Sequence, residues 1–179
     1  MQTIKKTISA NQVVNFGKPV TTPFLIPVTH ASTPNCINSP FMVDGKCYGV
    51  TALSFGSLYG VVMVENLDDI DISALGAALG THRLFPKGAN IVFVQILGGE
   101  DLKAQVWPLA GKKVAPFEAA CAAGTAAMML RKVLSGTVTV WMGKNSYHVE
   151  WDKGESDVRL TESRAEMGDD YIESAVLYA

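Results

Sequence analysis

The sequence predicts an α+β fold in which a strongly curved mixed β-sheet wraps around one buried central helix. Most of the chain consists of short apolar stretches of strand length, separated by turn residues. The segment 119–134 is apolar nearly all round, and a helix without a polar face is a buried helix. No linker or internal repeat divides the 179 residues, so we expect a single domain over 1–179.

Two β-hairpins are predicted from their turns. The first, at 41–53, turns at Asp44-Gly45, which can adopt positive φ angles between two apolar alternations. The second, at 137–151, is expected to turn at 143–145.

Four further strands complete the predicted sheet. The segments 60–66 and 90–97 are almost continuous runs of Val, Ile and similar residues, as in strands covered on both faces. The segment 101–109 is a strand that ends at Pro108, because proline cannot donate to a sheet. The last strand is predicted at 170–178.

Two helices are expected. The segment 68–82 carries acidic residues near its start, a helical spacing of apolar residues, and Gly80 as its stop. The second helix falls within the sequence PFEAACAAGTAAMMLRKVLSG, at 116–136. We expect Arg131 and Lys132 in its last turn, where the helix dipole favours cations, and Gly136 just after its end.

Composition and charge exclude several classes of function. A net charge of -2 with scattered Lys and Arg gives no basic surface for nucleic acid. No segment suits a membrane surface or a membrane span. The first residues lack the apolar stretch of a signal peptide, so we expect a cytoplasmic protein without a nucleic-acid or membrane partner.

The cysteines and histidines predict free thiols and no metal site. Cys36, Cys47 and Cys121 are an odd number at wide spacings, which does not fit a disulfide framework. The three histidines show no metal-ligand spacing with one another or with the cysteines. Cys36 and Cys47 are interpreted as structural residues.

The order of these segments resembles the C-terminal half of the diaminopimelate epimerases, cofactor-independent enzymes related to the phenazine-biosynthesis isomerases. The resemblance starts near VVNFGKP (13–19) and runs to the end of the chain. It includes VDGKCYGVTALSFGSLYGVVMVEN (43–66), LGTHRLFPKGANIVFVQIL (79–97) and AACAAGT (119–125). FPKGANIVFVQ (85–95) is the most specific match, and the combined order of the segments identifies the family.

The resemblance implies a fold and a chemistry. In that family, two pseudo-symmetric halves each place a barrel-like sheet around a central helix and one cysteine at the start of that helix. The two thiols face each other across the substrate, because inverting an α-carbon needs a base on one face and an acid on the other. Backbone N–H groups at a helix start stabilise the substrate carboxylate.

By this resemblance Cys121 is the candidate catalytic acid or base, with no cofactor. Asn90, at the entrance of a strand, also matches the family, and with Glu118, Gly124 and Thr125 it forms the candidate substrate-binding set. The substrate class is a small amino-acid-like carboxylate. The site would be completed either by a homodimer mate or by a separate protein that supplies the N-terminal half.

The sequence departs from the family around the candidate site. Pro108 and Leu109 stand where the family has a Glu-Arg pair, and Ala122 and Ala123 follow Cys121 where the family has Gly and Ser or Thr. The family's Gly-Asn-Pro-His loop becomes Gly-Ser-Leu-Tyr here, at 56–59, without the asparagine. These changes favour a substrate that is smaller or less polar than a diamino diacid.

Three functions therefore stay open. The chain is an epimerase-type isomerase, a non-catalytic binding or scaffold descendant, or an isomerase or cyclase repurposed for another small molecule, with Cys121 or Glu118 as base.

The start of the second helix bears on the choice among these three functions. A start at Pro116 puts Cys121 in the second turn, whereas a start at Ala120 puts it at the tip, where the dipole lowers a thiol pKa. Free cysteine is often simply buried, so packing is the alternative role of Cys121.

Overall fold

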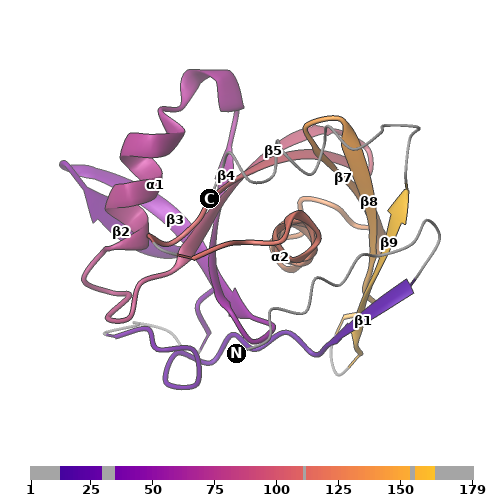
Figure 1. The fold of residues 1–179 in the computed structure, drawn as a ribbon, viewed down its shortest axis with the longest axis horizontal. Helices are drawn as coiled ribbons and strands as arrows, with labels where there is room; N and C mark the ends of the chain where they lie inside the picture. The colour runs from indigo at the N-terminus through magenta and orange to yellow at the C-terminus, as the bar shows by residue number, and fades with distance from the viewer. Residues whose placement is uncertain (1–12, 30–34, 111, 154–155, 164–179) are drawn as a thin grey trace.

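A computed structural model describes residues 13–29, 35–110, 112–153 and 156–163 of the chain (Figure 1). In these ranges two α-helices, one short 3-10 helix and nine strands are present. The helices are α1 (Ile72–Gly80), α2 (Pro116–Met129) and the 3-10 helix η1 (Leu67–Asp69). The strands are β1 (Val13–Gly17), β2 (Ser39–Val43), β3 (Lys46–Ser54), β4 (Leu58–Val64), β5 (Asn90–Gly98), β6 (Asp101–Trp107), β7 (Thr137–Met142), β8 (Asn145–Glu150) and β9 (Val158–Ser163).

All nine strands form one mixed sheet in the order β1-β9-β8-β7-β6-β5-β4-β3-β2. The pairs β4–β5 and β6–β7 are parallel and the other pairs are antiparallel. The sheet is open, with β1 and β2 at its edges. The predicted α+β class and mixed sheet are confirmed.

The two helices are the crossovers that the parallel strand pairs require. The connection from β4 to β5 contains α1, and the connection from β6 to β7 contains α2. In Figure 1, α2 is seen end-on inside the curve of the sheet, while α1 lies outside it. α2 contacts every strand from β3 to β9, whereas α1 contacts β2, β5 and β6.

Each helix has its own hydrophobic core, and the central strands serve both. Along β5, Val92 and Val94 pack in the cluster around α2, while Ile91 and Phe93 pack in the cluster beside α1. This alternation buries both faces of β5, as its continuous apolar sequence predicts.

The two hairpins form close to their predicted turns. Asp44 and Gly45 connect β2 and β3 with φ angles of 49° and 78°. The second turn is one residue shorter than predicted, because Asn145 already pairs with Met142 as the first residue of β8. The strand predicted at 170–178 lies outside the described residues.

Two strands were not predicted. β1 and β9 pair with each other, and β9 continues the sheet beside β8. In β9, Val158 and Leu160 are buried and alternate with exposed Arg159, so a period of two was present in the sequence but over too few residues to be decisive.

The end of α2 corrects a prediction. Arg131 and Lys132 lie beyond the helix, whose C-cap is Leu130. Arg131 adopts a left-handed conformation with φ of 57°, and its N–H donates to the Met128 carbonyl at 3.1 Å. The Lys132 N–H donates to the Ala127 carbonyl at 2.9 Å, which completes a Schellman motif. The residue that ends the helix is therefore Arg131 and not Gly136.

Close packing of α2 on the sheet requires a glycine at 124. A Cβ atom added there would lie 2.8 Å from Val138 Cγ1 and 3.0 Å from Val149 Cβ. Both valines are fully buried in β7 and β8, so neither can move aside easily.

We therefore predict that Gly124→Ala destabilises the protein by about 1–3 kcal/mol in urea unfolding, despite the better helix propensity of alanine. Ala77→Gly, at an exposed position of α1, is the matched control for propensity and should cost only about 1 kcal/mol. A Gly124→Ala protein as stable as the wild type would contradict close contact between α2 and the sheet.

Candidate functional site

Cys121 lies in the second turn of α2 and not at its tip. The helix begins at Pro116, with Ala115 as N-cap, so Cys121 is its sixth residue and the start at Ala120 is wrong. The dipole acts mainly on groups in the first turn of a helix. Cys121 is also fully buried, at 0% exposure.

The surroundings of Cys121 favour the neutral thiol. Burial raises the pKa of Cys121 well above its ordinary value, and the charge of Glu118 raises it further. A side-chain hydrogen bond with Thr125 acts in the opposite direction and is outweighed. The thiol is therefore protonated at neutral pH.

Gly124 and Thr125 serve the packing of α2. Gly124 gives β7 and β8 room to approach the helix. Thr125 is 0% exposed, and its hydroxyl donates a 2.7 Å hydrogen bond to the Cys121 carbonyl one turn earlier. Both predicted substrate-binding residues are therefore buried in this arrangement.

Asn90 connects three segments at the entrance of the parallel strands. It is the first residue of β5 and is 6% exposed. Its Nδ2 donates to the Leu58 carbonyl at 3.3 Å, and its Oδ1 accepts the Leu109 N–H at 2.8 Å. The side chain thus fixes the start of β4 against the segment that follows β6.

Glu118 is the candidate residue with a half-buried polar side chain, and it has a partner that the sequence did not reveal. The Tyr59 hydroxyl donates a 2.8 Å hydrogen bond to Glu118 Oε2. Tyr59 lies on β4 and is 1% exposed. Burial raises the pKa of Tyr59, and the charge of Glu118, the hydrogen bond to it and Cys121 add to this effect.

Tyr59, Glu118 and Cys121 therefore form one electrostatically coupled group beside the first turns of α2. The sequence did not predict the contact between Tyr59 and Glu118, because 57–59 stood out only for the absence of the family's asparagine. One signal was available, since a tyrosine at the start of a buried strand needs a hydrogen-bond partner for its hydroxyl.

Three phenylalanine rings form a cluster that includes Phe117, the residue before Glu118. Phe117 immediately precedes Glu118 in α2, and its ring centroid is 6.0 Å from that of Phe16 on β1. Phe16 also meets Phe55, just after β3, at 5.7 Å with the edge of one ring toward the face of the other. All three rings are partly buried and pack against the core cluster around α2.

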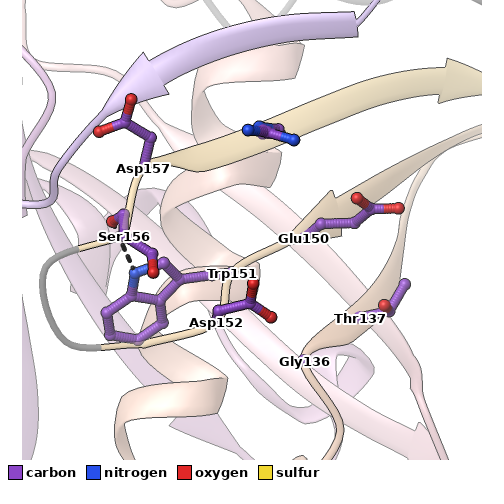
Figure 2. Close-up of a pocket in the computed structure, with 8 residues that line it drawn as sticks. Gly136, Thr137, Glu150, Trp151, Asp152, Ser156 and Asp157 are labelled. Atoms are coloured by element: carbon purple, nitrogen blue, oxygen red, sulfur yellow. Dashed lines mark hydrogen bonds between the residues drawn. The ribbon is translucent and has the colours of Figure 1, made fainter.

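A surface hollow lies elsewhere, along the start of β7, the end of β8 and the start of β9 (Figure 2). Its volume is about 590 Å³, and its lining combines three carboxylates, one guanidinium and the Trp151 ring, whose indole N–H donates to the Ser156 carbonyl at 3.2 Å. The lining residues are Gly136, Thr137, Glu150, Trp151, Asp152, Ser156, Asp157 and Arg159. None of the predicted site residues lines it.

The remaining sequence predictions concern thiols, metals and membranes. Cys36 and Cys121 are buried free thiols and Cys47 is an exposed one. Within the described ranges, no group of His, Cys, Asp and Glu is arranged to hold a metal ion. No helix in the described part of the chain is long and apolar enough to span a membrane.

Comparison with known proteins identifies relatives, although no protein-family model matches the chain. The diaminopimelate epimerase of Desulfovibrio desulfuricans is 29% identical over 157 residues, covering 83% of this chain and 53% of the relative. That of Teredinibacter turnerae is 32% identical over 154 residues, or 84% and 54% of the two chains. That of Methanococcus maripaludis is 25% identical over 169 residues, or 90% and 59%.

The fold and these matches define an epimerase-like protein. More specifically, the chain is a half-length relative of the diaminopimelate epimerases, and it spans about half the length of the curated relatives it matches. The resemblance inferred from the sequence is confirmed.

The raised pKa of Cys121 predicts a loss of stability at alkaline pH. The unfolded thiol releases its proton near pH 8.5, while the folded protein keeps it, so the stabilisation is complete below that pH and declines above it. As the pH rises from 8.5 to 10, this effect lowers the free energy of unfolding by about 2 kcal/mol.

Urea unfolding of wild type and Cys121→Ala at pH 8 and pH 10 measures this contribution. We expect a smaller alkaline loss in Cys121→Ala, while Cys47→Ala, at an exposed thiol, should behave as the wild type does. Equal losses in Cys121→Ala and wild type would show that the thiol titrates normally in the folded protein.

Burial also predicts which thiols react. In the native protein at pH 7.5, a chromogenic disulfide reagent should label Cys47 rapidly, and label Cys36 and Cys121 only after denaturation. Cys47→Ser should remove the fast phase. Rapid labelling in Cys47→Ser that disappears on further replacement of Cys121 would show an accessible, reactive Cys121.

Proposed function

We propose that the chain is one half-unit of an epimerase- or racemase-type isomerase that acts on a small amino-acid-like carboxylate. The observation that carries this proposal is the similarity to diaminopimelate epimerases over 78–90% of the chain in several relatives. The fold supports it, because α2 contacts seven strands of one curved sheet, as expected for a half of barrel-like form around a central helix.

Inversion of an α-carbon defines what such a site must contain. A base removes the α-proton, the C–H electron pair stays on the carbon, and an acid on the opposite face returns a proton. Since both groups cannot stand on one side of the substrate, we propose that a second unit faces α2 across the substrate. Either another copy of this chain or a separate polypeptide would supply it.

Cys121 is the proposed acid or base by its position in the family, with Asn90, Glu118, Gly124 and Thr125 as its proposed substrate-binding neighbours. Of these side chains, Glu118 is the polar one that is only half-buried, so it is the best placed for direct contact. Pro108 and Leu109 replace a charged pair of the family, which favours a less polar substrate than a diamino diacid.

The proposed place of action is the cytoplasm. All three cysteines are free thiols, and Cys47 is exposed, which suits a reducing compartment.

One observation favours a second candidate function, a non-catalytic binding or scaffold protein. Cys121, Gly124 and Thr125 are all buried, and Asn90 bonds to the backbone of two neighbouring segments. A descendant that kept the core of the fold and lost substrate binding would have these residues buried or bonded to the backbone in the same way. A repurposed isomerase or cyclase is the intermediate case, with the same groups and another small molecule.

Exchange of the substrate α-proton separates these functions. The purified chain, in the assembly it forms in solution, is incubated in deuterated water with a panel of apolar and polar amino acids, and deuterium incorporation is followed by mass spectrometry. We expect incorporation with at least one amino acid, and a reduction of roughly 100-fold or more in Cys121→Ser, the range typical of a lost acid–base group.

Cys47→Ser is the matched control, because it removes an exposed thiol on β3, whereas Cys121 is buried. Unchanged exchange in Cys121→Ser would remove Cys121 from the mechanism. Absence of exchange across the whole panel in the wild type would favour the binding or scaffold protein.

A further inference from the structure

We propose that Glu118 is a second proton-transfer group of this site, beside Cys121, and that Tyr59 is the residue that holds its carboxylate in position. The inference rests on the proposed isomerase function and adds two roles that the resemblance to the epimerases does not supply.

The geometry around Glu118 is that of a positioned base. Oε2 accepts the 2.8 Å hydrogen bond from Tyr59, whose ring is buried in β4 and therefore gives the hydroxyl a fixed place. Oε1 has no hydrogen-bond partner among the described residues. The Glu118 side chain is half-buried, so part of it is accessible to solvent. One oxygen is thus held by Tyr59, while the other has no partner within the described ranges and is the proposed proton acceptor.

The contrast with Cys121 strengthens the assignment. The thiol is 0% exposed, and its raised pKa keeps it protonated at neutral pH, so it is a poor base for a substrate in solvent. Glu118 lies one helical turn nearer the start of α2, on the same side of the helix, with its side chain half-buried. A substrate that approaches this end of α2 meets the carboxylate before the thiol.

The proton transfer balances within this arrangement. The Glu118 carboxylate forms an O–H bond with the α-proton, and the C–H electron pair passes into the substrate carboxyl group as an enediolate. Return of a proton from Glu118 regenerates the original stereoisomer, whereas return from an acid on the opposite face inverts it. Exchange with solvent deuterons at Glu118 is therefore observable before any inversion takes place.

The experiment measures deuterium wash-in, as kcat and KM, for wild type and four variants. Glu118→Gln keeps the shape and an acceptor for Tyr59 but removes the base, and should lower kcat by roughly 100-fold or more. Glu118→Asp retains a carboxylate and should recover part of the lost activity. Tyr59→Phe should lower kcat about 10-fold with little change in KM, because the carboxylate loses its fixed orientation.

Tyr48→Phe is the control for Tyr59→Phe. Tyr48 lies on β3, packs with the other hydrophobic cluster and stacks with Lys46, whose Nζ is 5.4 Å from the ring centroid. The Tyr48→Phe protein should catalyse deuterium wash-in at the wild-type rate. Thermal unfolding of each variant confirms that the loss of exchange is not a loss of fold.

The outcomes separate this inference from the proposed function. Wild-type exchange in Glu118→Gln together with lost exchange in Cys121→Ser overturns the role of Glu118 and leaves the isomerase. Lost exchange in Glu118→Gln, with recovery in Glu118→Asp, supports it whether or not Cys121 is needed. Wild-type kcat in Tyr59→Phe overturns the positioning role of Tyr59. Absence of exchange in the wild type overturns both proposals together.

Discussion

The burial of α2 on all sides is the constraint on which the rest of the structure depends. Ten consecutive residues, from Ala119 to Met128, are buried, so no face of the helix is left for solvent over this length. A flat sheet covers only one side of a helix, and the strands therefore have to curve around it until β3 through β9 all contact it. Small side chains make this possible, as Gly124 shows where β7 and β8 approach the helix closely. The hydrophobic effect and dense packing thus set the shape of the sheet.

The same constraint determines the chemistry that α2 can support. Polar groups beside a fully buried helix must find protein partners, because water is excluded. Thr125 bonds to the backbone of its own helix, and Asn90 to that of two neighbouring segments. The Tyr59 hydroxyl bonds instead to Glu118, at the end of the helix where burial becomes incomplete. The first turn of α2 thus carries a half-buried carboxylate with a protein partner, while the deeper thiol of Cys121 is held neutral by its surroundings.

Local patterns in the sequence were sufficient for the elements that local forces determine. The Asp44-Gly45 turn, the apolar strand β5 and the buried character of α2 follow from residues close together in the chain. The end of α2 was misplaced because Arg131 adopts the left-handed conformation that glycine usually takes. The pair Tyr59–Glu118 joins residues 59 positions apart, and only the pairing of β4 in the sheet brings them together. Candidate residues could thus be named from the family resemblance, but their partners and burial depend on contacts that are distant in sequence.

The residues around Cys121 give a physical reason for the position at which α2 starts. The family has glycine directly after the cysteine, and glycine within a helix costs about 1 kcal/mol relative to alanine. Here Ala122 occupies the position of that glycine, and Pro116 provides a favourable first helical residue. Both features favour a helix that begins before the cysteine. The resemblance implies a cysteine at the helix tip, whereas here Cys121 lies in the second turn and Glu118 lies in the first, beside Tyr59. The start of the helix at Pro116 therefore accounts for both a buried Cys121 and a half-buried carboxylate nearer the helix end.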